Sequence, residues 1–269
     1  MTVTNSGQSS PKYDVIALER LGNIAFDKRN WSEATRLLSE SLTIREKSAG
    51  TKEPGYGLAL DRLAEIHMQQ GKYQEALVLL EKALPILESA FYPGHSSVAA
   101  IVEHQGDCFV ILGRLAEAEA AFKRASDIFT TCVTLENRVT LRSLYKLAKV
   151  YIAEEKAAEA KATLQKGLKY VDTPLGPMAE FRYQLALAAI LLKEAGEARD
   201  LLHTAAADFK QRGNYGRVAD CSSALADICR LDNAELEADE WMRQSALFSQ
   251  MAVNAPYPDD IFLATLLRA

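Results

Sequence analysis

Apolar and polar residues along the chain recur with the three-and-four spacing of helices that bury one face. The segment KYQEALVLLEKALPI, Lys72 to Ile86, is one example. Its dipeptide Glu75-Ala76 comes back at near-constant intervals along the chain. The pattern therefore predicts a series of amphipathic helices built from one repeated unit.

Four columns of residues define the repeat. The dipeptide Glu-Ala occurs six times, with spacings of 42, 42, 42, 38 and 40 residues between the alanines Ala34, Ala76, Ala118, Ala160, Ala198 and Ala238. Thirteen residues before each alanine stand Leu21, Leu63, Gln105, Leu147, Leu185 and Leu225, each followed by glycine or alanine. Four residues after each alanine stand the large residues Leu38, Leu80, Phe122, Leu164, Leu202 and Met242. Seven residues after it stand the small residues Ser41, Ala83, Ala125, Gly167, Ala205 and Ser245.

Close helix packing explains these columns. Two helices that cross at about 8–10 Å have no room for bulky side chains on both partners, so a small residue such as Ala76 marks the contact. Glu75 faces outward in the first turn of its helix, where a negative charge complements the helix dipole. Turn signals such as Gly71 to Tyr73 separate the columns, whereas Lys193 and Asn233 replace the turn glycine in the last two repeats.

Each repeat is thus predicted to be a helical hairpin. The first helices are expected near residues 13–28, 56–70, 96–112, 136–154, 176–193 and 215–231. The second helices are expected near residues 31–48, 73–90, 115–132, 157–170, 195–212 and 234–252.

The columns resemble the tetratricopeptide repeat, and the period near 42 residues resembles its kinesin-light-chain-like subclass. The resemblance implies an all-α, right-handed superhelical solenoid of about six hairpins over residues 13–255. Its repeats fall at 13–55, 56–95, 96–135, 136–175, 176–214 and 215–255. Residues 1–12 are expected to be a disordered tail, and residues 256–269 to be a C-terminal capping helix, because Ile261 to Leu267 is apolar.

Composition excludes several classes of function. The net charge of −5 gives no basic footprint for nucleic acid, and no run of apolar residues is long enough for a membrane span. No catalytic motif is found, and the four cysteines and four histidines stand singly. We therefore expect a cytoplasmic protein that is not an enzyme, with free cysteines in its core and no metal or cofactor.

The resemblance also indicates a partner-binding groove on the first helices. The positions that face the groove in this family include here Glu19, Asn23, Asp61, Glu65, Glu103, Asp107, Tyr145, Lys149 and Tyr183, and Arg142 is expected to line the groove beside them. Carboxylates at Glu19, Asp61 and Glu103 disfavour the clamp with which some relatives hold a partner's C-terminal carboxylate. We expect an exposed acidic trough in the first three repeats, which fits a partner's basic segment, and a basic and aromatic end beyond it.

The leading interpretation is an adaptor that binds a peptide or helix of a partner protein. One alternative is a sensor of a small peptide, which would be favoured by saturable stabilisation with short peptides. A second alternative is a structural protein that self-associates, for which the C-terminal helix would be a possible hook on a neighbour.

Overall fold

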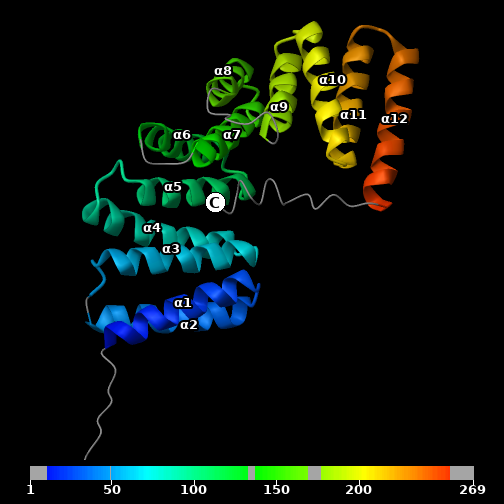
Figure 1. Ribbon diagram of the computed structural model, residues 1–269. Coiled ribbons are helices and arrows are strands. Elements are labelled where there is room, and N and C mark those ends of the chain that lie inside the picture. The colour runs from blue at the N-terminus through cyan, green and yellow to red at the C-terminus, as the bar shows by residue number, and fades with distance from the viewer. Residues whose placement is uncertain (1–10, 49, 133–136, 169–176, 255–269) are drawn as a thin grey trace, which may run out of the picture. The chain divides into compact units, whose positions relative to one another are not determined.

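The chain forms helical hairpins in series (Figure 1). The computed structural model describes residues 11–48, 50–132, 137–168 and 177–254. These residues form twelve helices and no strand. The six first helices are α1 (Pro11–Asp27), α3 (Pro54–Gln69), α5 (Ser96–Ile111), α7 (Asn137–Ala153), α9 (Pro177–Leu191) and α11 (Tyr215–Leu231). The six second helices are α2 (Trp31–Ser48), α4 (Tyr73–Ala90), α6 (Leu115–Thr131), α8 (Ala157–Leu168), α10 (Ala195–Gln211) and α12 (Glu235–Asn254).

The helices lie where the repeat columns place them. Every predicted boundary within the described residues agrees with the observed one to within two residues. The all-α repeat solenoid is confirmed. The predicted capping helix at 256–269 lies outside the described residues, as do residues 1–10 of the predicted tail.

The chain divides into two compact units. The N-terminal unit runs to Cys132, and the C-terminal unit begins at Val133. In the N-terminal unit, α1 pairs with α2, α3 with α4 and α5 with α6, and α2 packs on α3 and α4 on α5. The C-terminal unit repeats this order, with α8 packed on α9 and α10 on α11. Each unit therefore contains three hairpins joined by second-to-first helix junctions.

The recurring Glu-Ala dipeptide has the predicted packing role. The alanine of all six copies is fully buried. The glutamate of all six copies lies in the first turn of a second helix, where it complements the helix dipole. Small residues on the first helices are equally constrained, since a Cβ added to Gly106 would lie 2.6 Å from Phe122 Cε1. Cys108, Cys221 and Cys229 are buried, which confirms the expected core position for these three cysteines.

The turn inside each hairpin does not require glycine. One residue in each turn has positive φ, at Arg29, Gly71, Gly113, Glu155, Lys193 and Asn233. The next residue's N–H donates to the carbonyl five residues earlier in all six hairpins, as Lys72 N does to His67 O at 2.8 Å. This bond closes a Schellman-type helix end with backbone atoms alone. The loss of the turn glycine at Lys193 and Asn233 therefore leaves the fold unchanged.

Ala76→Leu is expected to lower the free energy of unfolding by about 1–3 kcal/mol, because the extra carbons have no space at a fully buried crossing. Glu75→Ala, on the exposed side of the same turn, is expected to cost well under about 1 kcal/mol. Urea unfolding of both variants measures the difference. Equal losses would contradict the assigned packing of the repeat.

Candidate functional site

The first helices contact one another within each unit. In the N-terminal unit α3 contacts α5, and in the C-terminal unit α9 contacts both α7 and α11. The residues that the resemblance assigns to a groove lie on these helices. We call the surface that they share the first-helix face of each unit.

In the N-terminal unit, His104 of α5 links two of the predicted acidic residues of α3. Its Nδ1 lies 2.8 Å from Asp61 Oδ1, and its Nε2 lies 3.4 Å from Glu65 Oε1. Burial of the imidazole opposes its protonation, but Asp61, Glu65 and Asp107 outweigh burial and raise the pKa of His104 to about 9. His104 is therefore an imidazolium at neutral pH, with Nδ1 hydrogen bonded to Asp61 and Nε2 in an ion pair with Glu65.

This cluster predicts a pH dependence of stability. The pKa of His104 is about 9 in the folded chain and 6.5 ordinarily. Its contribution to the free energy of unfolding is therefore complete below pH 6.5 and is lost as the pH rises to 9. We expect the free energy of unfolding to fall by about 1–3 kcal/mol over this range. His104→Gln removes the titrating group, so its urea unfolding curves should lack this slope. Parallel pH profiles for both proteins would contradict the pairing.

The other residues predicted in this unit have different surroundings. Glu19 Oε1 accepts hydrogen bonds from Arg45 Nε at 2.7 Å and from Ser41 Oγ at 2.8 Å. These bonds join α1 to its own second helix. Asn23 is exposed, Asp107 is partly buried, and Glu103 is fully buried.

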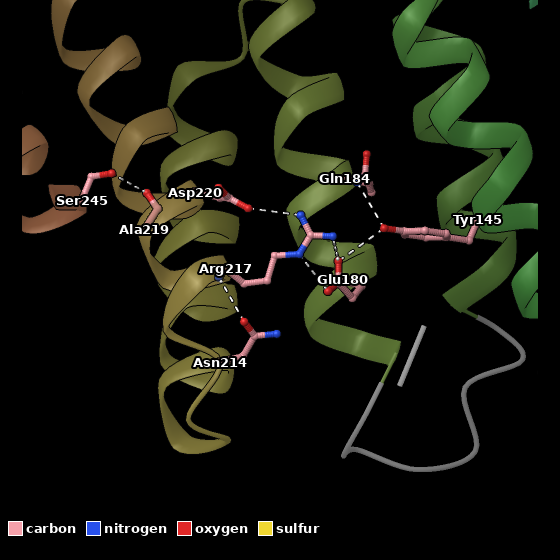
Figure 2. A network of polar contacts seen from close by, with 8 residues as sticks. All are labelled: Tyr145, Glu180, Gln184, Asn214, Arg217, Ala219, Asp220 and Ser245. Atoms are coloured by element: carbon pink, nitrogen blue, oxygen red, sulfur yellow. Dashed lines mark hydrogen bonds and ion pairs between the residues drawn. The ribbon is translucent and has the colours of Figure 1, made fainter. Parts of the chain in front are cut away.

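In the C-terminal unit, a polar network joins three first helices (Figure 2). Arg217 of α11 donates from Nε to Glu180 Oε1 of α9 at 3.1 Å, and its Nη2 lies 3.0 Å from Glu180 Oε2. Tyr145 of α7 donates to Glu180 Oε2 at 3.3 Å and accepts from Gln184 Nε2 at the same distance. The carboxylate of Glu180 thus receives hydrogen bonds from both neighbouring helices.

Local chain geometry positions the arginine of this network. Asn214 caps α11, since its Oδ1 accepts from Arg217 N at 3.1 Å, and this fixes the first turn that carries Arg217. The guanidinium also lies 5.4 Å from the centre of the Tyr183 ring, within cation–π range. Burial raises the pKa of Glu180, although Arg217 favours its charged form. Burial also raises the pKa of Tyr183 to about 12, so both tyrosines on this face are neutral phenols.

The structure thus brings the predicted site residues together in two groups. Asp61 and Glu65 meet through His104, and Tyr145 and Tyr183 meet through Glu180 and Arg217. Lys149 is exposed and its Nζ lies 5.9 Å from the Tyr145 ring centre, whereas Arg142 is partly buried.

Glu103 contradicts the expectation of an exposed acidic trough, and Tyr145, at the basic and aromatic end, is buried as well. Glu103 is fully buried because α5 packs against α3, α4 and α6. Tyr145 is buried because α7 packs against α8 and α9, and its hydroxyl is hydrogen bonded there. Asp61 and Glu65 are partly buried and paired, so the acidic surface is less open than the sequence indicated.

Three central residues, His104, Glu180 and Arg217, are not among the groove positions predicted from the sequence. The sequence carries a signal for the first, since the position before the leucine column is basic at Arg20, Arg62, His104 and Lys146. In the first three repeats this basic residue directly follows Glu19, Asp61 or Glu103. Glu180 and Arg217 fall in none of the four columns of the repeat, so the repeat pattern does not single them out.

No group of three or more His, Cys, Asp or Glu side chains in the described part of the chain could hold a metal ion. Among the described residues, no helix is long and apolar enough to cross a membrane.

Comparison with known proteins identifies the repeat. One tetratricopeptide repeat model matches residues 13–89, and a second matches residues 141–170. No curated protein sequence matches the chain. Repeats of a kinesin light chain from Podosopora anserina superpose with a TM-score of 0.65 and 22% identity, covering 76% of this chain and 99% of that chain.

Two other solved structures share the fold. A tetratricopeptide repeat protein from Parabacteroides merdae has a TM-score of 0.63 and 17% identity, covering 95% of this chain and 98% of that chain. The apo form of RapI has a TM-score of 0.62 and 15% identity, covering 93% of this chain and 88% of that chain. The repeat models and these structures agree, so the chain contains tetratricopeptide repeats at residues 13–89 and 141–170 and has the fold of a tetratricopeptide repeat solenoid.

Proposed function

We propose that this protein is a non-enzymatic adaptor that binds a peptide or helix of a partner protein on its first-helix faces. The observation that carries the proposal is the alignment of polar and aromatic residues along contacting first helices. Glu180 and Arg217 hold neighbouring first helices in fixed positions, so the exposed groups beside them form a pre-organised surface. Repeat solenoids typically bind partners on such surfaces.

The two faces differ in the partner chemistry that they favour. Asn23, Asp61, Glu65 and Asp107 favour a basic segment on the N-terminal unit, although His104 offsets part of the acidic charge. On the C-terminal unit, the exposed Lys149 and the ring of Tyr183 favour acidic or aromatic residues.

The test compares two variants that change the net charge equally. Asn23→Lys/Asp107→Lys alters the first-helix face, and Ser39→Lys/Asp127→Lys adds the same charge to exposed positions of second helices. A partner is first identified by affinity capture and mass spectrometry, and its affinity for each variant is then measured at several salt concentrations. We expect about a tenfold loss of affinity and a flatter salt dependence for the first variant alone.

Circular dichroism of both variants ensures that the fold is retained. Equal affinity of the two folded variants for the partner would show that binding occurs on another surface. If only short peptides stabilise the protein saturably and no partner protein is recovered, a peptide sensor becomes the better description.

A further inference from the structure

Junctions between successive hairpins bury a fixed set of first-helix positions. Within each unit, α2 packs on α3, α4 on α5, α8 on α9 and α10 on α11. On α3, α9 and α11 the leucine column is buried, with 8% exposure at Leu63, 5% at Leu185 and 2% at Leu225. Three residues further on, the side chains are 0–1% exposed at Ile66, Cys108, Ala188 and Ile228.

On α1, the same positions keep apolar residues but are open. Leu21 is 52% exposed and Ile24 is 48% exposed, and the neighbouring Ile16 is exposed as well. α1 therefore carries half of a junction between hairpins, and within the described residues no second helix of a preceding hairpin packs on it.

α12 carries the other half of such a junction, the half that a second helix supplies. Four residues after the repeat alanine, Leu38, Leu80, Phe122, Leu164 and Leu202 are 0–1% exposed, whereas Met242 is 38% exposed. Seven residues after the alanine, Ser245 keeps the small side chain that the junction requires, and its hydroxyl donates to Ala219 O at 3.0 Å (Figure 2). α12 thus presents a large and a small residue in the register that receives a first helix.

Charges at the two ends complement each other in the same register. At the junction between α10 and α11, Arg199 directly follows the repeat alanine, and its Nη2 lies 2.8 Å from Asp232 Oδ2 in the next hairpin turn. In α12 the position of Arg199 is taken by Asp239, and in the turn after α1 the position of Asp232 is taken by Lys28. Both residues are exposed, so a junction between α12 and α1 would have the same ion pair with its charges exchanged.

We propose that the protein self-associates head to tail, with α12 of one copy packed on α1 of a second copy as an additional repeat junction. The contact is heterologous, so it extends into chains of copies or closes into a ring. One helix-on-helix junction is smaller than the about 1,200–2,000 Å² of stable complexes, so association is reversible and concentration dependent. The first-helix faces take no part in it, and partner binding is therefore a separate property.

Analytical ultracentrifugation of the full chain from about 5 to 500 µM tests the contact. We expect the average mass to rise with concentration for the wild type. Leu21→Glu places a charge in the contact and should weaken association at least about tenfold. Val78 is an apolar residue of α4 with similar exposure, 44% against 52% for Leu21, so Val78→Glu is the matched control and should associate like the wild type. A wild type that stays monomeric throughout this range overturns the proposal.

Charge exchange distinguishes head-to-tail contact from other modes. Lys28→Asp and Asp239→Lys should each weaken association about threefold or more, and the double variant should recover it, because each contact then has both charges again. Association through paired α1 helices would respond to Lys28→Asp but not to Asp239→Lys. That result, or a double variant weaker than both single variants, contradicts the proposal.

A mixture of two variants gives a second test of the head-to-tail contact. Leu21→Glu blocks the α1 end and Met242→Glu blocks the α12 end, so an equimolar mixture should form dimers and nothing larger. Residues 255–269 follow α12 and are an alternative occupant of its outer side. If the full chain is monomeric and a chain ending at residue 254 associates, that segment covers α12 and the proposal is wrong.

Discussion

Arg217→Met is expected to lower the free energy of unfolding by about 2–4 kcal/mol at neutral pH. The change removes the guanidinium that pairs with Glu180 and leaves a carboxylate with 8% side-chain exposure without its cation. Breaking a fully buried ion pair costs about 3–5 kcal/mol, and the loss is smaller here because Arg217 is 26% exposed. Urea unfolding measures the effect.

The control for this prediction lies on the same helix. Arg230→Met removes an arginine whose ion pair with Asp227 is exposed, so its cost should stay below about 1 kcal/mol. Glu180→Gln in the Arg217→Met background removes the stranded charge and should recover part of the loss. If Arg217→Met and Arg230→Met have equal free energies of unfolding, the network does not stabilise the C-terminal unit.

The loss should also depend on pH. The pKa of Glu180 is already raised by burial, and without Arg217 it rises further. A carboxyl whose pKa is raised on folding destabilises the folded chain as the pH rises above the unfolded value, here 4.5. The difference between Arg217→Met and the wild type should therefore be smaller near pH 4.5 than at pH 7.

Phe122→Ala is expected to cost about 3–5 kcal/mol, because the ring is nearly fully buried and its removal leaves a cavity. Phe91→Ala, at an exposed helix end where the ring stacks on His95, should cost about 1 kcal/mol or less. Thermal and urea unfolding of both variants test the difference. Equal costs would show that the ring of Phe122 is not a principal part of this hairpin's core.

A double variant tests the specific contact of that ring. A Cβ on Gly106 would lie 2.6–2.9 Å from three atoms of the Phe122 ring. Gly106→Ala should therefore destabilise the wild type by about 1–3 kcal/mol and cost less in a Phe122→Leu background, where the side chain is smaller. A cost that is independent of residue 122 would contradict the contact.

The fold could be predicted from the sequence because it depends on short-range periodicity. The spacing of Ala76 from Leu63 and Leu80 sets the helix faces, and the same spacing in six copies determines the helix boundaries to within two residues. The repeat also predicts the positions of the turns that lack glycine, because Lys193 and Asn233 adopt positive φ under the constraint of the packed hairpin.

The state of the polar residues on the first helices could not be predicted in the same way. Whether Asp61 is free or paired depends on His104, 43 residues later, and Glu180 depends on Arg217, 37 residues later. Such pairs depend on the relative placement of successive repeats. Likewise, Leu21 has the same residue type as its buried counterparts, and it is exposed because no second helix of a preceding hairpin packs on α1 in the described residues.

The backbone-closed turns offer a set of equivalent labelling positions. The left-handed residue of each turn is exposed, and its side chain takes no part in the bond that closes the hairpin. Glu155 and Asn233, in the first and last hairpins of the C-terminal unit, already have side chains beyond Cβ at this geometry. Fluorophores attached there would follow the separation of hairpin tips during mechanical stretching. A stepwise increase in dye distance would then count the hairpins as they open, and a single jump would show that the unit unravels as one cooperative block.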